Sequence, residues 1–305
     1  MLSAGACLLA LAGCAAPQAT ALRAEPERLQ SRTRLLEVPF FAQDEYQCGP
    51  AALAMVLNTQ GRAVTPQELV AQVYLPSREG SLQAEMLATA RRHGLLAVEL
   101  PPRLDAVLAE IAAGRPVIVL QNLALPIVPK WHYAVVIGYD LDAGQLVLHS
   151  GLTERQRLGI DVFEHTWARS SHWAMLATAP DRLPATLDGD RLLAAAVALE
   201  RVSPAAARRA YTALTERSVL DYGAWFGLGN TAAADGDYSA ALVAFEYATT
   251  LRPDSADAWN NLALMRLRDG QRDAAVDAAR RAVLLGGPRL ERYRETLARV
   301  QRAPR

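Results

Sequence analysis

Apolar and polar positions follow two different periods between the N-terminus and position 180. Up to residue 113 the apolar side chains recur at helical spacing, which predicts helices over residues 48–58, 65–74, 81–93 and 104–113. After Gly114 the pattern changes to short apolar runs, which predict strands over residues 116–120, 132–139, 145–149 and 172–177. Residues 140–144 supply turn residues, so we expect the second and third strands to form a hairpin. Helices followed by antiparallel strands predict an α+β fold.

The chain beyond residue 190 is rich in alanine and repeats itself. Identical residues recur at one constant spacing in the pairs Trp225 and Trp259, Leu228 and Leu262, Gly236 and Gly270, Ala241 and Ala275, Ala244 and Ala278, and Ala248 and Ala282. This spacing, closed by Pro253, resembles tetratricopeptide repeats, whose period is about 34 residues. Residues 191–220 resemble a degenerate earlier unit through Ala194, Ala207 and Leu214, and residues 290–302 would cap the array. The resemblance implies stacked helices whose concave face binds a partner protein, with Asn230, Asn261 and Arg266 as candidate lining residues.

Composition and charge narrow the classes of partner. Of 305 residues, 51% are hydrophobic and 21% are charged, as in a packed globular protein. The 32 basic residues balance 32 acidic residues, and phosphate binding needs a basic excess, so we expect no nucleic-acid partner. After the leader, no apolar stretch is long enough to span a bilayer.

Residues 1–16, MLSAGACLLALAGCAA, form a short apolar core that ends in small side chains, as secretory signals do. The segment Leu11-Ala12-Gly13-Cys14 resembles the lipobox of bacterial lipoproteins, in which the cysteine is acylated and becomes the first mature residue. Ala15 follows it in place of an aspartate, so the resemblance implies an exported protein anchored at the periplasmic face of an outer membrane. The polar residues 15–34 are expected to form a flexible tether.

Cys48 is the cysteine that remains outside this leader, because Cys7 and Cys14 both lie within it. Free cysteine is often a small buried hydrophobe, and the clustered ligands of structural zinc are missing from this sequence. The context of Cys48 nevertheless points to chemistry. It opens a predicted helix in which Pro50 fits the first turn, and a helix N-terminus favours the thiolate. Gly49 would let a substrate approach the sulfur closely.

His132 opens an apolar strand and is the candidate partner of this thiol. A thiol at a helix N-terminus and a distant histidine are what a cysteine nucleophile needs, with the histidine acting as base and then as acid. Gln43 could donate its side-chain N–H to a developing oxyanion, together with the backbone N–H of Cys48. Gln47 is the competing candidate for that donor.

Two segments together resemble the C39-like peptidases, a papain-like family. They are residues 38–57, which contain VPFFAQDEYQCGPAAL, and the expected hairpin over residues 132–151, which begins HYAVVIGYD. The resemblance covers residues 36–180 and implies a papain-like cysteine peptidase. By position, it implies Cys48 as nucleophile, His132 as base and Gln43 as oxyanion donor.

One position departs from the family pattern, which places an aspartate just after the strand that follows the catalytic histidine. Residues 146–151 read LVLHSG, so Ser150 takes the aspartate position and His149 is its neighbour. Side chains alternate along a strand, so only one of the two can face His132. Either Ser150 or His149 would therefore orient the histidine.

These observations give two functional hypotheses. The first is a lipid-anchored cysteine peptidase that hydrolyses peptide bonds and carries a repeat module for a protein partner. The second is an inactive papain-like scaffold that binds peptides. The expected partners are a peptide or protein substrate, a protein on the repeats and the membrane through the anchor, with no cofactor and no metal. The expected order is signal 1–14, tether 15–34, peptidase domain 35–180, linker 181–190 and repeat domain 191–302.

Overall fold

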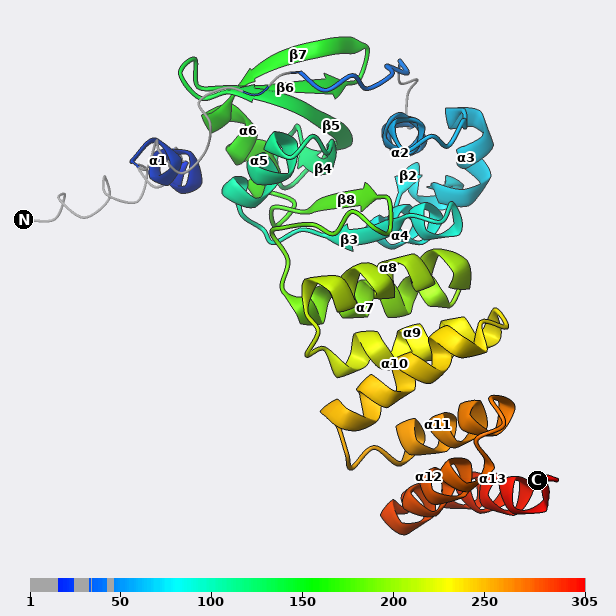
Figure 1. Ribbon diagram of the computed structural model, residues 1–305. Helices are drawn as coiled ribbons and strands as arrows, with labels where there is room; N and C mark the ends of the chain where they lie inside the picture. The colour runs from blue at the N-terminus through cyan, green and yellow to red at the C-terminus, as the bar shows by residue number, and fades with distance from the viewer. Residues whose placement is uncertain (1–15, 25–32, 34, 43–46, 305) are drawn as a thin grey trace, which may run out of the picture. The chain divides into compact units, whose positions relative to one another are not determined.

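A computed structural model describes residues 16–24, 33, 35–42 and 47–304. The chain divides into two compact units, which are described separately (Figure 1). The N-terminal unit runs to Ala179 and includes Pro184–Leu187. The repeat unit contains Pro180–Leu183 and the chain from Asp188 onward.

The N-terminal unit is built on a six-stranded antiparallel sheet with strand order β3-β8-β4-β5-β6-β7. Its strands are β3 (Leu96–Glu99), β4 (Val117–Asn122), β5 (Trp131–Asp140), β6 (Gln145–Ser150), β7 (Thr153–Gly159) and β8 (Ala174–Thr178). Its principal helices are α2 (Cys48–Thr59), α3 (Pro66–Val73), α4 (Gln83–Arg92), α5 (Leu104–Ala112) and α6 (Ile160–Ala168). A short ribbon of β1 (Tyr74–Leu75) and β2 (Gly80–Ser81) flanks the 3-10 turn Pro76–Arg78. The α+β prediction and the predicted hairpin are thus confirmed.

Helix α2 is the centre of the core. Its residues from Gly49 to Leu57 are all buried, so it has no solvent-facing stripe over this length. It packs on the sheet face that carries Val135 and Ile137 of β5, together with Met86 and Ala90 of α4. The opposite face is covered by α5 and α6, as the hydrogen bond between the side chains of Gln121 in β4 and Thr166 in α6 shows. Because helices cover both faces of the sheet, the sheet is a rigid support for α2.

The β5–β6 hairpin contains a bulge that sets its local register. Val135 pairs with His149, but the register shifts between Val136 and Gly138. A Cβ atom on Gly138 would lie 2.6 Å from Leu35 Cδ2, so glycine lets the preceding chain run close to the strand. There the backbone N–H of Leu36 donates to Ile137 O at 2.9 Å. Bulges of this kind change the direction of nearby side chains.

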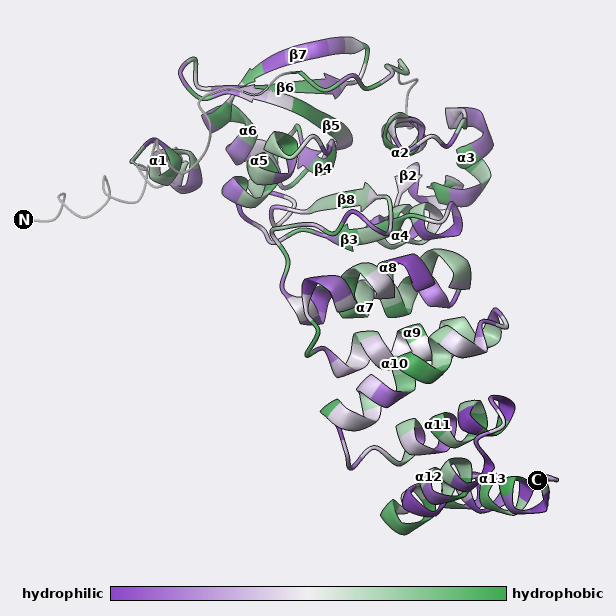
Figure 2. Cartoon of the chain, in the orientation of Figure 1, coloured by the Kyte–Doolittle hydropathy of each residue, from purple (hydrophilic) through white to green (hydrophobic). Residues whose placement is uncertain are grey.

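The elements that the sequence analysis did not predict include β3, β7 and α6. Strand β7 reads TERQRLG and is mostly exposed, and Figure 2 shows it as a hydrophilic strip. It is the edge strand beside β6, where polar side chains discourage pairing with another chain. Its sequence therefore lacks the apolar alternation by which strands are recognised.

Residues expected within a flexible tether form helix α1 (Pro17–Ala24). The buried carboxylate of Glu164 in α6 accepts from the backbone N–H groups of Gln18 at 2.9 Å and Ala19 at 2.7 Å. These groups would otherwise lack partners at the start of a helix. The tether prediction is wrong for this stretch because a distant carboxylate caps the helix.

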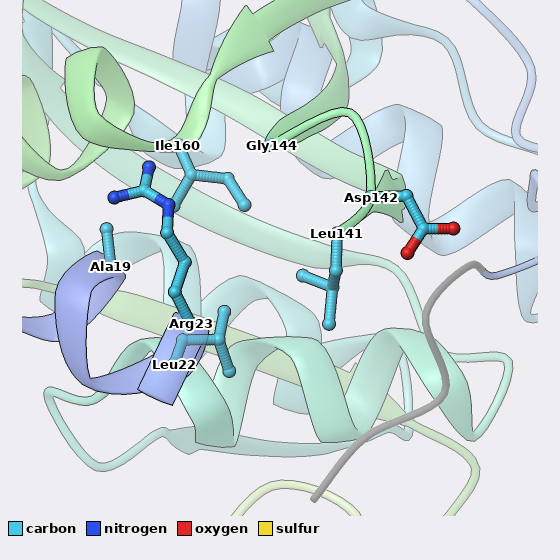
Figure 3. Close-up of a pocket in the computed structure, with 7 residues that line it drawn as sticks. All are labelled: Ala19, Leu22, Arg23, Leu141, Asp142, Gly144 and Ile160. Atoms are coloured by element: carbon cyan, nitrogen blue, oxygen red, sulfur yellow. The ribbon is translucent and has the colours of Figure 1, made fainter. Parts of the chain in front are cut away.

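The docked helix borders a small apolar cavity of about 150 Å³ (Figure 3). Ala19, Leu22 and Arg23 line one side, and Leu141, Asp142, Gly144 and Ile160 line the other. Arg23 reaches Asp161 at the start of α6 with an N–O distance of 2.6 Å. Helix α1 is therefore part of the N-terminal unit.

The repeat unit consists of α7 (Gly189–Glu200), α8 (Pro204–Arg217), α9 (Tyr222–Ala234), α10 (Tyr238–Leu251), α11 (Ala256–Arg268), α12 (Arg272–Leu285) and α13 (Leu290–Arg302). The predicted period appears in its contacts. The indole N–H of Trp225 donates to Val219 O, and that of Trp259 donates to Pro253 O, both at 2.9 Å. Packing equivalent side chains in equivalent sites is what makes such an array regular.

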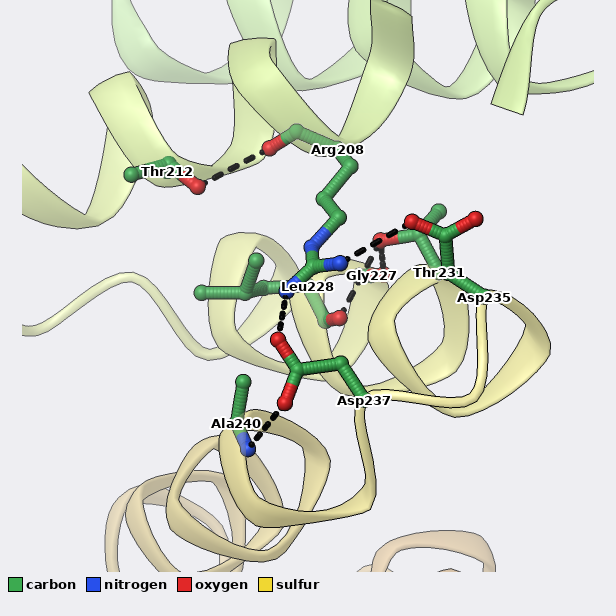
Figure 4. A network of polar contacts seen from close by, with 8 residues as sticks. All are labelled: Arg208, Thr212, Gly227, Leu228, Thr231, Asp235, Asp237 and Ala240. Carbon is green, nitrogen blue, oxygen red and sulfur yellow. Dashed lines mark hydrogen bonds and ion pairs between the residues drawn. The ribbon is translucent and has the colours of Figure 1, made fainter. Parts of the chain in front are cut away.

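An ionic contact joins two successive helical pairs in this unit (Figure 4). Arg208 of α8 contacts both Asp235, at 3.0 Å, and Asp237. Asp237 also caps α10 by accepting from the backbone N–H of Ala240 at 3.1 Å. One carboxylate therefore serves both as a helix cap and as an ion-pair partner between neighbouring helices.

Within the described ranges, no helix is long and apolar enough to cross a membrane.

Candidate active site

Cys48 is the first residue of α2, as the sequence predicted. Gln47 precedes it as the N-cap residue, and its backbone oxygen accepts from the N–H of Ala51 at 3.2 Å. Pro50 lies in the first turn, where a helix has no internal partner for an N–H. The cysteine is free and partly buried. The local sequence thus places a thiol where a helix begins.

The space beside Gly49 is filled by the protein itself. A Cβ atom at this position would lie 2.2 Å from Ser81 Oγ and 2.5 Å from Ser81 Cβ. Ser81 is held in turn by the hydroxyl of Tyr133, which donates to the Ser81 backbone oxygen at 3.0 Å. The sequence analysis assigned the missing side chain of Gly49 to substrate approach, but the structure assigns it to this internal contact. Glycine lets β2 close tightly over the start of α2.

The thiol of Cys48 lies against strand β5. The last pair between β5 and β6 is Val135 with His149, and Tyr133 lies beyond it. There the backbone of Tyr133 hydrogen-bonds the Cys48 thiol. Because Tyr133 directly follows His132, this contact brings the sulfur to the segment of β5 that carries the histidine.

His132 is anchored by the residue that stands at the family's aspartate position. Its Nε2 lies 2.9 Å from Ser150 Oγ, the hydroxyl at the end of β6. The His132 backbone pairs with Gln121 of β4 on the other side. Two strands therefore fix the imidazole, one through the backbone and one through a hydroxyl.

Burial shifts the pKa values of the two candidate residues in opposite directions. Desolvation, assisted by the positive charge of Lys130, lowers the pKa of His132 to about 4. Desolvation also raises the pKa of the Cys48 thiol, while backbone hydrogen bonds from Tyr133, Gly49 and Cys48 act in the opposite direction. At neutral pH the resting site therefore holds a neutral imidazole and a protonated thiol. The thiolate expected from the helix N-terminus is outweighed by desolvation.

His149, the alternative orienting residue, is not brought to His132. It is 1% exposed, and its Nε2 donates to Val38 O at 3.0 Å. Its Nδ1 accepts from the backbone N–H of Arg155 at 3.2 Å, and its ring lies 5.2 Å from the Phe40 ring. Both ring nitrogens are used in holding the chain around residues 38–40 to the sheet. Of the two candidates, Ser150 alone contacts His132.

The two candidate oxyanion donors have different standing. Gln43 lies outside the described residues. Gln47 is described, but its side chain makes no capping hydrogen bond at the start of α2. Across the described part of the chain, no group of three or more His, Cys, Asp or Glu residues is arranged to hold a metal ion. Sequence reasoning missed the contacts of Ser81 and Tyr133, which no motif marks.

Comparison with family models matches residues 35–175 to the Peptidase C39 like family. Tetratricopeptide repeat models match residues 192–249 and 228–289. A search of curated proteins finds no match.

Three solved structures are similar to parts of the chain. A C39-like peptidase from Bacillus anthracis is 18% identical, covers 49% of this chain and 98% of its own, and gives a TM-score of 0.41. A double glycine motif protease from an AMS/PCAT transporter, solved in complex with the leader peptide, is 21% identical. The match covers 49% of this chain and 99% of that protease, with a TM-score of 0.37. The type III secretion chaperone SycD of Yersinia enterocolitica, solved with a peptide of the translocator YopD, is 19% identical. The match covers 37% of this chain and 91% of SycD, with a TM-score of 0.34. By the family models, residues 35–175 form a domain of the C39-like peptidase family, and tetratricopeptide repeats follow it over residues 192–289.

Proposed function

We propose that the N-terminal unit is a cysteine peptidase in which Cys48 attacks a peptide carbonyl and His132 moves the proton. One observation carries this proposal: Ser150 holds His132, and the next residue along the strand, Tyr133, hydrogen-bonds the Cys48 thiol. Strand β5 thus contacts the thiol through the Tyr133 backbone and carries the candidate base, oriented by a hydroxyl, at the preceding residue. Membership of residues 35–175 in the C39-like family supports the same reaction.

The reaction proceeds in two halves. In the first, the thiol proton moves to His132 as a sulfur–carbon bond forms, and the tetrahedral intermediate then breaks its carbon–nitrogen bond. The departing amine takes the proton from the imidazolium, leaving a thioester on Cys48. In the second half, water gives a proton to His132 and adds to the thioester. The carbon–sulfur bond then breaks to release the carboxylic acid product, and the sulfur takes the proton back from His132 to regenerate the thiol. The Cys48 backbone N–H and Gln43 stabilise the oxyanion in both halves.

Ser150 decides which imidazole nitrogen takes part. Its hydroxyl occupies Nε2 of His132, so Nδ1 is the nitrogen that exchanges the proton with the thiol. A hydroxyl gives orientation but no negative charge to stabilise an imidazolium. Because the resting pair is neutral, the proton moves during the attack on substrate and not before it.

The absence of that charge favours a second candidate function. A serine in the aspartate position, together with a His132 pKa lowered to about 4, suits a site that binds a peptide without cleaving it. In this case the papain-like domain would be a peptide-binding scaffold. Whether the protein cleaves the peptides that it binds distinguishes the peptidase from the scaffold.

We also propose a protein partner for the repeats and a lipid anchor at Cys14. The match to tetratricopeptide repeats supports the first proposal. So does an open groove of about 480 Å³ whose lining includes Leu284 and Leu297 beside Arg280 and Arg281. The lipobox-like segment Leu11–Cys14 supports an exported protein held at the periplasmic face of an outer membrane.

The deciding experiment incubates the protein with a proteome-derived peptide mixture and identifies new peptide termini by mass spectrometry. Wild type is compared with Cys48→Ala and His132→Ala, and with Asp142→Asn as a surface control. We expect cleavage by wild type and the control and none by the other two variants. Binding of peptides without any Cys48-dependent cleavage would overturn the peptidase proposal and leave the scaffold.

A further inference from the structure

A strongly apolar loop joins β4 to β5 immediately before the candidate base. Residues 123–131 read LALPIVPKW, and several of their side chains face solvent. The exposed fractions are 63% for Leu125, 84% for Ile127 and 69% for Val128. Leu123 and Trp131 at the base are about half exposed, at 47% and 50%. Single exposed apolar residues are common, but a contiguous group of this kind marks an interaction site.

The base of this loop is held firmly. Asn122, itself 1% exposed, accepts from the backbone N–H groups of Ala124 at 3.0 Å and Lys130 at 2.9 Å. The N–H of Leu123 donates to Lys130 O at 3.0 Å, which closes the loop. Arg169 donates to the backbone oxygens of Asn122 at 3.1 Å and Ala124 at 2.8 Å. Pro126 and Pro129 restrict the tip further. Apolar side chains are therefore presented on a fixed frame, which lowers the entropy cost of binding.

The position of the loop relates it to the thiol. Trp131 ends the loop and His132 follows it, and the Tyr133 backbone next contacts the Cys48 sulfur. The side chain of Tyr133 packs in the core on the α2 side of the sheet. Trp131 lies two positions before it on β5, where it pairs with Asn122, so alternation places the Trp131 side chain on that same side. Cys48 opens the helix on that same side. Trp131, at the base of the apolar loop, therefore lies on the same side of the sheet as the candidate nucleophile.

We propose that residues 123–131 bind apolar side chains of the peptide substrate next to the scissile bond. The inference deepens the proposed function, since it rests on a peptide site at Cys48. Lys130 is the one charged residue of the loop. The loop therefore offers hydrophobic contact and little charge recognition, and the substrate class is a peptide with aliphatic residues around the bond. A lipid surface is the other apolar partner of this chemistry, and the adjacency to His132 favours the peptide.

The test measures peptide binding without turnover. Two fluorescein-labelled decapeptides share a central Ala-Ala; one carries Leu, Val and Ile on both sides, the other Gln, Thr and Ser. Their dissociation constants are measured by anisotropy on full-length Cys48→Ala protein, alone and combined with Ile127→Ser and Val128→Ser. Val162→Ser is the matched control, because Val162 is also an exposed apolar residue of the N-terminal unit.

We expect the aliphatic peptide to bind at least about tenfold more tightly than the polar one, and the two loop substitutions together to remove that preference. The control should keep it. Equal binding of both peptides, or a preference unaffected by the loop substitutions, overturns the inference. Loop-dependent binding of the protein to phosphatidylcholine vesicles without peptide preference assigns the loop to a lipid surface and also overturns it.

Cleavage of the aliphatic peptide by protein that retains Cys48 is measured separately. Loop-dependent binding without cleavage overturns the peptidase and leaves the binding surface. Cleavage that is unchanged by the loop substitutions supports the peptidase and overturns the binding role of the loop.

Discussion

Ser150 Oγ lies 2.9 Å from His132 Nε2 across the end of the β5–β6 hairpin. This contact gives the histidine an orientation but not a counter-charge. The pKa of His132 remains depressed because burial and Lys130 both disfavour the imidazolium. The imidazole is thus held in place by Ser150 and is neutral at rest.

Introducing the missing charge should change the histidine. In Ser150→Asp, a carboxylate next to the imidazolium should raise the His132 pKa by roughly one to three units. NMR titration of the histidine ring protons in wild type, Ser150→Asp and Ser150→Asn measures this, with the asparagine variant as the uncharged control. An unchanged His132 pKa in the aspartate variant would show that the position does not act on the imidazole. In the peptidase case, hydrolysis should also increase in Ser150→Asp.

Alkylation of Cys48 by iodoacetamide should follow a protonated resting thiol. Its pKa is raised by burial, so the rate should be low at pH 6 and should still be rising above pH 8.5. His132→Ala should leave the low rate at pH 6 nearly unchanged in the protein without substrate. The measurement is labelling followed by mass spectrometry across pH 5 to 10. A fast plateau near pH 6 that disappears in His132→Ala would instead reveal a preformed ion pair.

The stability of the N-terminal unit should fall in acid. Burial lowers the pKa of His132 to about 4 and also lowers the pKa of His149. A lowered histidine pKa in the folded state favours unfolding as the pH falls below about 6.5, because the unfolded chain then binds more protons. The free energy of unfolding that neutral, buried His132 contributes should therefore be fully present above pH 6.5 and be lost toward pH 4. This loss should be at most about 3 kcal/mol. Urea unfolding of wild type and His132→Gln at pH 7.5 and 4.5 tests this, and an equal loss in both would contradict it.

Gly49→Ala should destabilise the start of α2. The new methyl would collide with Ser81 Oγ and Ser81 Cβ, and overpacking of this kind costs about 1–3 kcal/mol. Gly159→Ala is the control, since the nearest atom to its added Cβ is 4.0 Å away in Val162. Thermal unfolding measures both. Adding Ser81→Gly to Gly49→Ala should restore part of the loss; no recovery would place the strain elsewhere.

Removing the Glu164 carboxylate should release α1. In Glu164→Ala, two backbone donors of Gln18 and Ala19 lose a buried partner, which costs about 1–3 kcal/mol locally. Hydrogen exchange of residues 17–24 should speed up by about tenfold or more. Arg23→Ala removes only a half-exposed ion pair with Asp161 and should change little. Equal exchange in both variants would contradict the capping role.

Much of the fold could be predicted because the decisive signals are local. A nearly continuous apolar run from Ala51 to Leu57 marked α2 as a buried helix, and the turn at residues 140–144 marked the hairpin. Strand β7 escaped because an edge strand can be polar on both faces. Helix α1 escaped because its cap, Glu164, is more than a hundred residues away in the sequence. Tertiary contacts of this kind leave no periodic signal.

For the site, the strand alternation limited the neighbour of His132 to one of two residues, and the structure shows a contact with Ser150. The choice of Ser150 over His149 depended on where β6 stops and on the bonds of His149 to Val38 and Arg155. The pKa of Cys48 could not be predicted, since the helix start favours a thiolate while burial opposes it. The amount of burial is a property of the packed domain and is not written in the residues around Cys48.

The docking of α1 has a consequence for the proposed lipid anchor. With Cys14 as the anchor and α1 beginning at Pro17, only three Cα–Cα steps, about 11 Å, separate lipid from folded protein. A flexible tether from Cys14 to Arg34 would allow the domain to reach much farther from the bilayer. Under the proposed acylation of Cys14, so short a tether would hold the N-terminal unit at the bilayer surface, and its substrates would have to arrive there.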